Sequence, residues 1–325
     1  MDKTALLIDG DILCFRAAAV IEKRTVMITD LETGEKKEYN TRTEFKDLLK
    51  KEGIEFDKAR YEFKDVQTPE PPQNAFHIIK NQILKMESDL WPDVVKVFIS
   101  GKDNFRDTLE LPEKYKGQRS DMLRPIHLRE CKKYVWKNTD CTVSDNAEAD
   151  DYLIFRGYEY LNKGYNVIVA TNDKDAHAYS GLNIYDFTQP SPELKLIPDF
   201  GSIWERPSDK EIKGEGFLWF CFQWLNGDPV DNYKPCQLAG VKFGKKSAYN
   251  LLVDAKTKQE ALRIVIDQYK KWYPKEFEYT AWDGRVIKSD YKHMLQLFLK
   301  CAKMKTSRND GLDLDKFLKK QGVEL

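Results

Sequence analysis

The sequence has no excess of charge of either sign, because its 53 Lys and Arg residues balance 53 Asp and Glu residues among 325. A polyanionic partner would therefore be held by local basic patches and not by the field of the whole molecule. Long apolar runs are also missing. The most apolar stretch, 217–225, is interrupted by Gln223 and is far shorter than the roughly 20 residues of a membrane-spanning helix. We expect a cytoplasmic protein without a membrane partner.

Cysteine, glycine and proline are scarce. The six cysteines are scattered without a C-x-x-C pair, which argues against a zinc knuckle or a disulfide framework and favours reduced, buried thiols. With 17 Gly, 13 Pro and 41% hydrophobic residues, the composition excludes collagen-like and disordered chains. A chain of this length can form one large domain or two modest ones.

Apolar segments alternate with helical patterns through the first 200 residues. Buried strands are predicted at 4–9, 94–100, 165–171 and, more weakly, 182–187; helices are predicted at 73–90, 126–136 and 148–163. This alternation is typical of an α/β domain with a mainly parallel sheet, whose ligands bind at the carboxyl ends of the strands. Residues 25–64 break the pattern with a hairpin turning near 32–34 and a charged helix, which we interpret as an insertion. From about 201 onward the pattern is mostly helical.

Carboxylates gather where these elements start or stop. The clusters are Asp9 with Asp11; Glu148, Asp150 and Asp151; Asp173 with Asp175; and Asp228 with Asp231. Like charges brought together would destabilise the fold unless cations neutralise them, and all-oxygen sites suit magnesium or manganese. The clusters therefore predict a divalent metal centre.

Each cluster also has an ordinary structural explanation when taken alone. Asp145 and Glu148 fit a capping box, and acids in a first helical turn favour the helix dipole. The segment from Asn226 to Asp231 fits a simple turn. Asp11 could ligate a metal, bridge through water or cap a helix, so its role stays open.

Basic residues form a complementary pattern in two places. The strip 114–137 combines many Lys and Arg side chains with Tyr115, Tyr134 and Trp136, as expected for gripping a phosphate backbone and stacking on bases. Its alternative is a solvated helix face. In the turn 240–250, two glycines precede lysines at a predicted helix start, where backbone N–H groups could approach a phosphate.

The order of these motifs resembles the five-prime nuclease family, which includes flap endonucleases, the five-prime nuclease domain of bacterial DNA polymerase I and phage exonucleases. The similar segments, between residue 6 and about 250, are LLIDGDILCFR, NFRDTLELPEKYKGQR, EADD, ATNDKDAHA, GDPVDN and GVKFGKKSA. The chain length and the D-G-D opening are most similar to the bacteriophage exonucleases.

This resemblance implies a PIN-like, Rossmann-like α/β nuclease domain over 1–200, with an insertion at about 25–64 and an arch at about 114–137. It implies a helical DNA-binding region over 201–325 with a helix-hairpin-helix-like element. The implied activity is Mg²⁺-dependent 5′-3′ exonuclease or flap endonuclease cleavage in DNA replication or degradation. The implied partners are DNA 5′ ends, flaps and RNA primers, with replication proteins as candidate partners, in the host cytoplasm if the protein is viral.

The resemblance also implies residue roles. Asp9, Glu148 and Asp150 would line a first metal site, and Asp151, Asp173, Asp175 and Asp231 a second, with Asp228 nearby. Mn²⁺ would be a substitute for Mg²⁺ in both. Lys116 and Arg119 would face the scissile phosphate and act with Asp9, Asp150 and Asp173 in catalysis. Residues implied in substrate binding are Arg106, Tyr115, Lys116, Arg119, Arg124, Lys132, Lys133, Gly240, Gly244, Lys245 and Lys246, with 124–137 as the arch.

The sequence departs from the family pattern at three points. Ser100 and Gly101 follow the second strand where the family usually has an aspartate, and Asp103 is the nearest carboxylate. The glycine spacing at 240–244 and the longer stretch before it argue against a potassium ion, which the family's helix-hairpin-helix-like element often holds. The insertion at 25–64 has no counterpart that we can place.

Three alternatives remain open. A branched-DNA-binding protein with a decayed site would explain the missing aspartate. A haloacid dehalogenase-type phosphatase would use Asp9 as a nucleophile, but there the later G-D-x-x-D motif follows a strand and here it follows a predicted helix. An RNA-cutting relative would share the chemistry and differ in substrate.

Overall fold

The computed structural model describes residues 3–325 and has the expected mixed α/β architecture. Its contacts divide the chain into two compact units. The first contains the chain up to Ile12, Met86–Met122 and Thr139–Leu325, and the second contains Leu13–Lys85 and Leu123–Asn138. Residue 200 is therefore not a boundary between these units.

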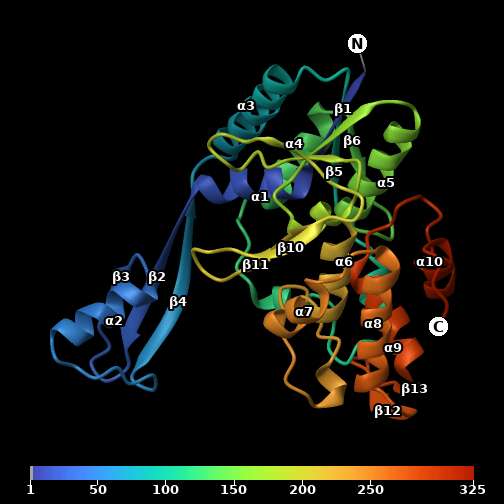
Figure 1. The fold of residues 1–325 in the computed structure, drawn as a ribbon. Coiled ribbons are helices and arrows are strands. Elements are labelled where there is room, and N and C mark those ends of the chain that lie inside the picture. Colours follow the sequence, from blue (N-terminus) through green and yellow to red (C-terminus); the bar gives the residue numbers. More distant parts are fainter. Residues whose placement is uncertain (1–2) are drawn as a thin grey trace. The chain divides into compact units, whose positions relative to one another are not determined.

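A six-stranded sheet forms the centre of the first unit (Figure 1). In sheet order, its strands are β6 (Cys141–Val143), β5 (Val94–Ile99), β1 (Thr4–Asp9), β7 (Asn166–Ala170), β8 (Asn183–Tyr185) and β9 (Leu194–Leu196). All neighbours pair in parallel except β8 and β9. The fold class expected from the alternating pattern is thus confirmed, and the carboxyl ends of β5, β1 and β7 meet at one edge.

The central strands are buried because their sequences are apolar on both faces. Leu6, Leu7 and Ile8 of β1 are fully buried. Helix α5 (Ala149–Asn162) packs against β1, β5 and β7. It approaches closely at Gly157, where an added Cβ would lie 2.9 Å from a Leu182 methyl group. This packing fixes where α5 begins relative to the strand ends.

The rest of the first unit is mostly helical. Its helices are α6 (Gly216–Asn226), α7 (Lys245–Leu252), α8 (Lys258–Trp272), α9 (Tyr291–Ala302) and α10 (Leu314–Lys320); its hairpins are β10 (Ser202–Glu205) with β11 (Ile212–Glu215) and β12 (Phe277–Thr280) with β13 (Val286–Ser289). Short 3₁₀ turns are η1 (Phe105–Thr108), η2 (Gly117–Asp121), η3 (Lys174–Ala178) and η4 (Gln237–Ala239). The core centres on Trp224, whose carbonyl accepts from the Tyr269 hydroxyl at 2.9 Å. Within residues 3–325, no helix has both the length and the apolarity needed to cross a membrane.

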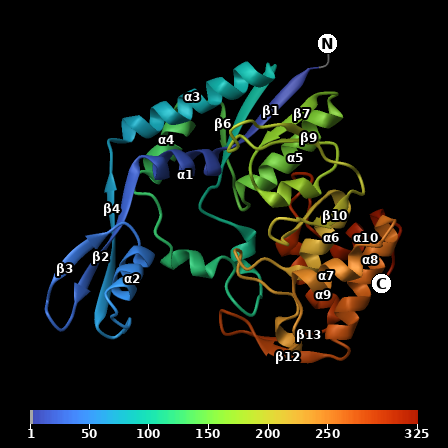
Figure 2. The ribbon, with the colours of Figure 1, turned by 60° about the vertical axis from the view of Figure 1, so that its left-hand side comes forward.

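The second unit contains a small sheet with a helix against it (Figure 2). The strand order is β3 (Lys36–Tyr39), β2 (Glu22–Asp30) and β4 (Tyr61–Pro69), all antiparallel. Helix α2 (Arg42–Lys51) inserts Phe45 into the core beside Val26 and Ile28. The expected hairpin and charged helix at 25–64 are therefore confirmed. Helix α4 (Leu128–Asn138) also belongs to this unit, while α1 (Gly10–Val20) and α3 (Pro72–Leu90) each contribute residues to both units.

Candidate functional site

Acidic side chains from three elements meet at the carboxyl edge of the six-stranded sheet. Asp9 ends β1 and is buried; its Oδ1 accepts from the Ile12 N–H at 3.0 Å and its Oδ2 from the Thr171 hydroxyl at 2.9 Å. Asp173 and Asp175 follow β7 in the turn that forms η3. Helix α5 and the loop after α6 add further carboxylates to this edge.

Burial and mutual repulsion raise the pKa values of these carboxyls. Burial, followed by the charges of Asp11 and Asp173, raises the pKa of Asp9 to about 7. Burial and the charges of Asp9 and Asp173 raise the pKa of Asp150 well above its usual value. Burial and the charge of Asp173 do the same for Asp175. Carboxylates from β1, α5 and η3 therefore repel one another in one place, as expected of a site that takes a cation.

Glu148 and Asp231 share two partners, Tyr115 and Lys116. The Tyr115 hydroxyl lies 2.8 Å from Asp231 Oδ2 and 3.2 Å from Glu148 Oε2. Lys116 pairs with Glu148 and lies 3.7 Å from Asp231, and Arg119 donates to Asp231 at 2.8 Å. Sequence reasoning placed these two carboxylates at different metal sites, whereas here they share the same basic and hydroxyl partners.

Lys116 has an unusual backbone conformation. It has a left-handed φ of +51°, which is uncommon for a residue with a side chain, and its N–H donates to the Asp231 carbonyl at 2.9 Å. Burial opposes its charge, but Glu148 and Asp231 outweigh burial and raise its pKa. Lys116 is thus held as a cation beside the acidic cluster.

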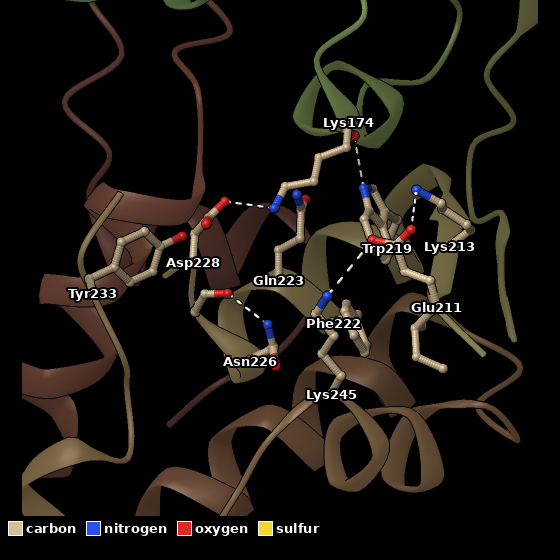
Figure 3. A pocket seen from close by; sticks show the side chains of 12 residues that line it. Lys174, Glu211, Lys213, Trp219, Phe222, Gln223, Asn226, Asp228, Tyr233 and Lys245 are labelled. Atoms are coloured by element: carbon tan, nitrogen blue, oxygen red, sulfur yellow. Dashed lines mark hydrogen bonds and ion pairs between the residues drawn. The ribbon is translucent and has the colours of Figure 1, made fainter. Parts of the chain in front are cut away.

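Asp228 lies in the turn that follows α6. Its Oδ2 accepts from the Lys174 ammonium at 2.6 Å, and its Oδ1 accepts from the Val230 N–H at 2.7 Å. The turn requires Gly227, which has a φ of +72° and whose added Cβ would lie 2.6 Å from the Tyr233 carbonyl oxygen. Figure 3 shows the Asp228 to Lys174 pair beside the amide of Gln223.

The donor set fits hard divalent cations. Its atoms are carboxylate oxygens, the ligands that Mg²⁺ and Mn²⁺ prefer, and burial together with their mutual repulsion raises the pKa values of Asp9, Asp150 and Asp175. Among the side chains that the structure describes, which exclude those of residues 1, 2, 120 and 121, no three acidic, His or Cys groups come close enough to enclose an ion as they stand. Lys116, Arg119 and Lys174 pair with three of the carboxylates instead.

Asp151, predicted at a metal site, and Arg106, predicted near the substrate, are paired with each other in the interior. Asp151 is fully buried and accepts from Arg106 at 2.6 and 3.1 Å, and from the Lys305 N–H at 2.9 Å. Arg106 is also buried and donates to the carbonyls of Lys300 and Lys303. These contacts engage both oxygens of Asp151 within the protein, and the buried Arg106 also lies 3.6 Å from Glu148 of the acidic cluster.

The start of α5 also differs from expectation. The helix begins after Glu148, so its capping box pairs Glu148 with Asp151 and not Asp145 with Glu148. The Asp151 carboxylate accepts from the Glu148 N–H at 3.1 Å. Because the box turns Asp151 inward, Asp150 is the first-turn acid that faces the cluster.

Tyr115 was predicted to bind substrate, but it is 3% exposed, so no base can stack on its ring. Its hydroxyl instead orients Glu148 and Asp231.

Ser100 stands where a strand-end aspartate was expected. Its N–H donates to both oxygens of Asp11, at 3.1 and 3.2 Å, and its hydroxyl accepts from the Ala149 N–H at 3.0 Å. Asp11 is thereby held at the end of β5, where the expected carboxylate is missing. The carboxylate that contacts this strand end is therefore Asp11, whereas the sequence had indicated Asp103 as the nearest one.

The remaining predicted substrate residues lie in two regions. In the second unit, Arg124 and Lys133 are exposed and Lys132 is half-buried. In the first unit, Gly240 has a left-handed φ of +65° and Gly244 is the N-cap of α7, which opens with Lys245 and Lys246, both exposed. Their substrate roles stay predictions.

Sequence reasoning missed Gln223. This glutamine is 7% exposed, and its Nε2 donates to Asp175 Oδ1. Its Oε1 is buried and has no hydrogen-bond partner among residues 3–325. A signal was available, because Gln223 is the one polar side chain in the apolar segment 217–225.

Comparison with known proteins shows similarity in structure. Neither a known family profile nor a curated protein sequence matches the chain. The fold is similar to that of the bacteriophage T5 5′-exonuclease with divalent metal ions (zinc) bound: 15% identity, a TM-score of 0.50, and coverage of 92% of this chain and 88% of that one. A T5 flap endonuclease structure in complex with DNA and metal ions has 13% identity and a TM-score of 0.48, covering 94% and 89% of the two chains. The expected resemblance to the phage five-prime nucleases is thus confirmed for the fold.

Proposed function

We propose that this protein is a divalent-metal-dependent 5′-nuclease that hydrolyses phosphodiester bonds at the 5′ ends or flaps of DNA, including RNA primers on DNA. One observation carries the proposal: Asp9, Asp150, Asp173 and Asp175 repel one another at a sheet edge beside the cations Lys116 and Arg119. A cluster of this kind loses its repulsion when it binds cations. The fold similarity agrees with this function but does not establish it.

Asp9, Glu148 and Asp150 would hold one Mg²⁺, and Asp173, Asp175, Asp228 and Asp231 a second, with Mn²⁺ as a substitute. Two bound metal ions would lower the pKa of the attacking water and stabilise charge on the attacking and leaving oxygens. Asp151, assigned to the second site from sequence, is instead proposed to position α5 through Arg106.

The other side chains prepare the site for a phosphodiester. Lys116 and Arg119 place positive charge beside Glu148 and Asp231, where they can stabilise the developing charge on the phosphate oxygens. The Tyr115 hydroxyl holds the same two carboxylates in orientation. A bound metal ion would supply the activation of the attacking water, so the proposed reaction requires no protein base. We expect products with a 5′-phosphate and a 3′-hydroxyl.

A cleavage assay tests this proposal. The substrate is a duplex with a 5′ flap, labelled at the 3′ end of the flap strand, incubated with Mg²⁺, Mn²⁺ or EDTA. Metal-dependent cuts at the junction would indicate an endonuclease, and stepwise shortening from the 5′ end would indicate an exonuclease. A parallel RNA–DNA hybrid measures primer preference.

The matched variants are a double substitution, Asp150→Asn with Asp173→Asn, and a control, Asp283→Asn. The double variant should lose cleavage by at least about a thousandfold, because two metal-facing carboxylates are removed. Asp283 pairs with Arg285 next to β13 and should not matter. Cleavage by the double variant at the wild-type rate would refute the mechanism. DNA binding without cleavage by the wild type, in either metal, would favour the branched-DNA-binding alternative.

A further inference from the structure

The segment 109–116 carries two residues of the site but has no regular structure of its own. Every residue of this segment is described, and none belongs to a helix or a strand. It ends with Tyr115 and Lys116, whose side chains contact Glu148 and Asp231. Lys116 has a left-handed φ of +51°, a conformation that persists only when the surrounding structure holds it. Contacts from other parts of the chain therefore fix this segment.

The hairpin of β12 and β13 (Figure 1) binds three consecutive carbonyl groups of the segment. The Trp282 indole N–H donates to the Leu109 carbonyl at 3.0 Å. The Tyr279 hydroxyl donates to the Glu110 carbonyl at 2.6 Å. The backbone N–H of Trp282 donates to the Leu111 carbonyl at 2.9 Å. Because the backbone polar groups of an irregular segment need partners elsewhere, these three donors replace the bonds that a helix or sheet would supply.

Two charged side chains also join the segment to the hairpin. The Lys114 ammonium lies 5.0 Å from the centroid of the Trp282 ring, within the range of a cation–π contact. Arg285 pairs with the Glu110 carboxylate at 2.8 Å, but these side chains are 49% and 34% exposed, so their pairing contributes little. The aromatic residues Trp282 and Tyr279 are therefore the main contacts of the hairpin with the segment.

The end of the segment is fixed by the loop after α6. The Lys116 N–H donates to the Asp231 carbonyl at 2.9 Å, and the Asn232 amide donates to the Lys114 carbonyl at 2.9 Å. The hairpin thus holds the start of the segment, and the loop that carries Asp231 holds its end. Both attachments together determine where the Lys116 ammonium lies.

We infer that Trp282 and Tyr279 are positioning residues of the proposed nuclease, which fix the segment 109–116 so that the Lys116 ammonium stays beside the acidic cluster. The inference rests on the proposed function and assigns a role in it to the β12–β13 hairpin. Reaction rates depend steeply on the position of charged groups, and a displacement of about 1 Å can reduce them about a hundredfold. The hairpin would therefore affect turnover without contacting the substrate.

Conservative substitutions can remove the side-chain donors and keep the aromatic rings. The test variant combines Trp282→Phe with Tyr279→Phe. One control is Trp204→Phe, since Trp204 and Trp282 are 37% and 36% exposed. The other is Asp283→Asn in the same turn, where the carboxylate bonds to Arg285. If the double variant does not fold, as judged by circular dichroism, Tyr279→Phe alone replaces it, because this change keeps the Trp282 contacts.

Hydrogen–deuterium exchange of the DNA-free protein in EDTA tests the positioning directly. In the double variant, amides at 112–119 should exchange at least about tenfold faster than in the wild type, while those of α8 should be unchanged. Neither control should alter exchange at 112–119. Unchanged exchange at 112–119 would overturn the inference. Equal acceleration in α8 would also overturn it, because it would show a general loss of stability.

Cleavage of the 5′-flap duplex in Mg²⁺ tests whether the positioning acts through Lys116. The double variant should have a kcat about ten- to a hundredfold lower, with KM changed less than about twofold. In a Lys116→Met background, the same two substitutions should lower kcat by less than about twofold further. A full additional loss in that background would show that the hairpin does not act through Lys116, and would overturn the inference.

The outcomes separate this inference from the proposed function. A wild type that cleaves, together with a double variant of unchanged kcat, overturns the inference and leaves the nuclease proposal standing. A wild type that cleaves neither in Mg²⁺ nor in Mn²⁺ refutes the proposed function and, with it, the catalytic part of the inference. The exchange experiment would then still decide whether the hairpin fixes the segment 109–116.

Discussion

Asp150 and Asp151 are adjacent in the sequence, but their surroundings shift their pKa values in opposite directions. Asp151 lies on a buried region of α5 that the protein neutralises by itself: Arg106 forms two hydrogen bonds with it and outweighs burial, so its pKa is lowered. Asp150 lies on the neighbouring acidic region, where burial, Asp9 and Asp173 raise its pKa well above the usual value. The capping box that turns one residue inward turns the other toward the cluster.

The fold neutralises the buried charge in one of these regions and leaves part of the neutralisation in the other to a ligand. Buried charges are stable when they are paired and hydrogen-bonded, and the Arg106 region meets this condition within the chain. The acidic region meets it in part, through lysine and arginine side chains that are more exposed. We therefore expect the first region to govern folding and the second to govern metal binding.

Removing the buried cation Arg106 should have the largest effect on stability. Arg106→Met leaves Asp151 charged and unpaired in the interior, and should lower the free energy of unfolding by about 3–5 kcal/mol. Urea denaturation in EDTA measures this change. The control Arg206→Met removes an exposed ion pair with Asp209 and should change little. Equal stability of the two variants would contradict a structural role for the Arg106 pair.

A matched pair of substitutions, at Asp150 and at Asp151, tests whether the two regions differ electrostatically. Asp150→Asn removes one of the repelling buried carboxylates and should therefore raise the free energy of unfolding of the metal-free protein. Asp151→Asn should instead lower it, because Arg106 loses its counter-charge. Denaturation curves at pH 7.5 in EDTA give both signs. If the signs agree, the two regions are not electrostatically distinct.

The pH dependence of stability should report the acidic region. The folded pKa of Asp9 is raised from 3.8 to about 7, so the folded protein holds its proton at pH values where the unfolded chain has lost it. The contribution of Asp9 to the free energy of unfolding therefore falls as pH rises from about 4 to 7. Melting temperatures in EDTA should decrease over this range, and Mg²⁺ at neutral pH should restore them. Asp9→Asn should flatten the profile, and an unchanged slope would contradict the assignment.

The smallest expected effect concerns Ser100, which supports the start of α5 for both regions. Ser100→Ala removes the acceptor for the Ala149 N–H but keeps the backbone contact to Asp11. We expect a loss of about 1 kcal/mol, as for other helix-start hydrogen bonds. Thermal denaturation compares it with Ser202→Ala at an exposed position of β10. A loss of Mn²⁺ binding would show that Ser100 also orients the metal site.

Much of the fold could be predicted because its central strands are unbroken apolar runs. The segments 4–9, 94–100 and 165–171 each formed a strand with ends within one residue of the predicted ones. The strands β6 and β9 were missed, since each has three residues and is partly exposed, so neither carries a recognisable apolar run. The position of the acidic clusters followed from the strand ends.

Side-chain roles were harder to predict because burial depends on distant segments. Arg106 and Tyr115 have the residue types of a phosphate-binding surface, but packing from residues about 190 positions later covers Arg106. Gln223 shows the reverse case, in which a polar residue in an apolar segment turned out to contact the acidic cluster. The sequence contains the residue types, and tertiary contacts decide which atom faces which.

The contacts of Asp151 also set an order of events during synthesis. The Lys305 N–H that binds this carboxylate lies 154 positions later in the chain, and the carbonyl of Lys303 that receives Arg106 lies 197 positions after it. A ribosome that adds about 5–20 residues per second makes Lys305 roughly 8–30 s after Asp151. Throughout that interval the nascent chain lacks the Lys305 N–H that binds Asp151 in the first turn of α5. The proposed site would thus be complete only after the segment that contains Lys303 and Lys305 has been made.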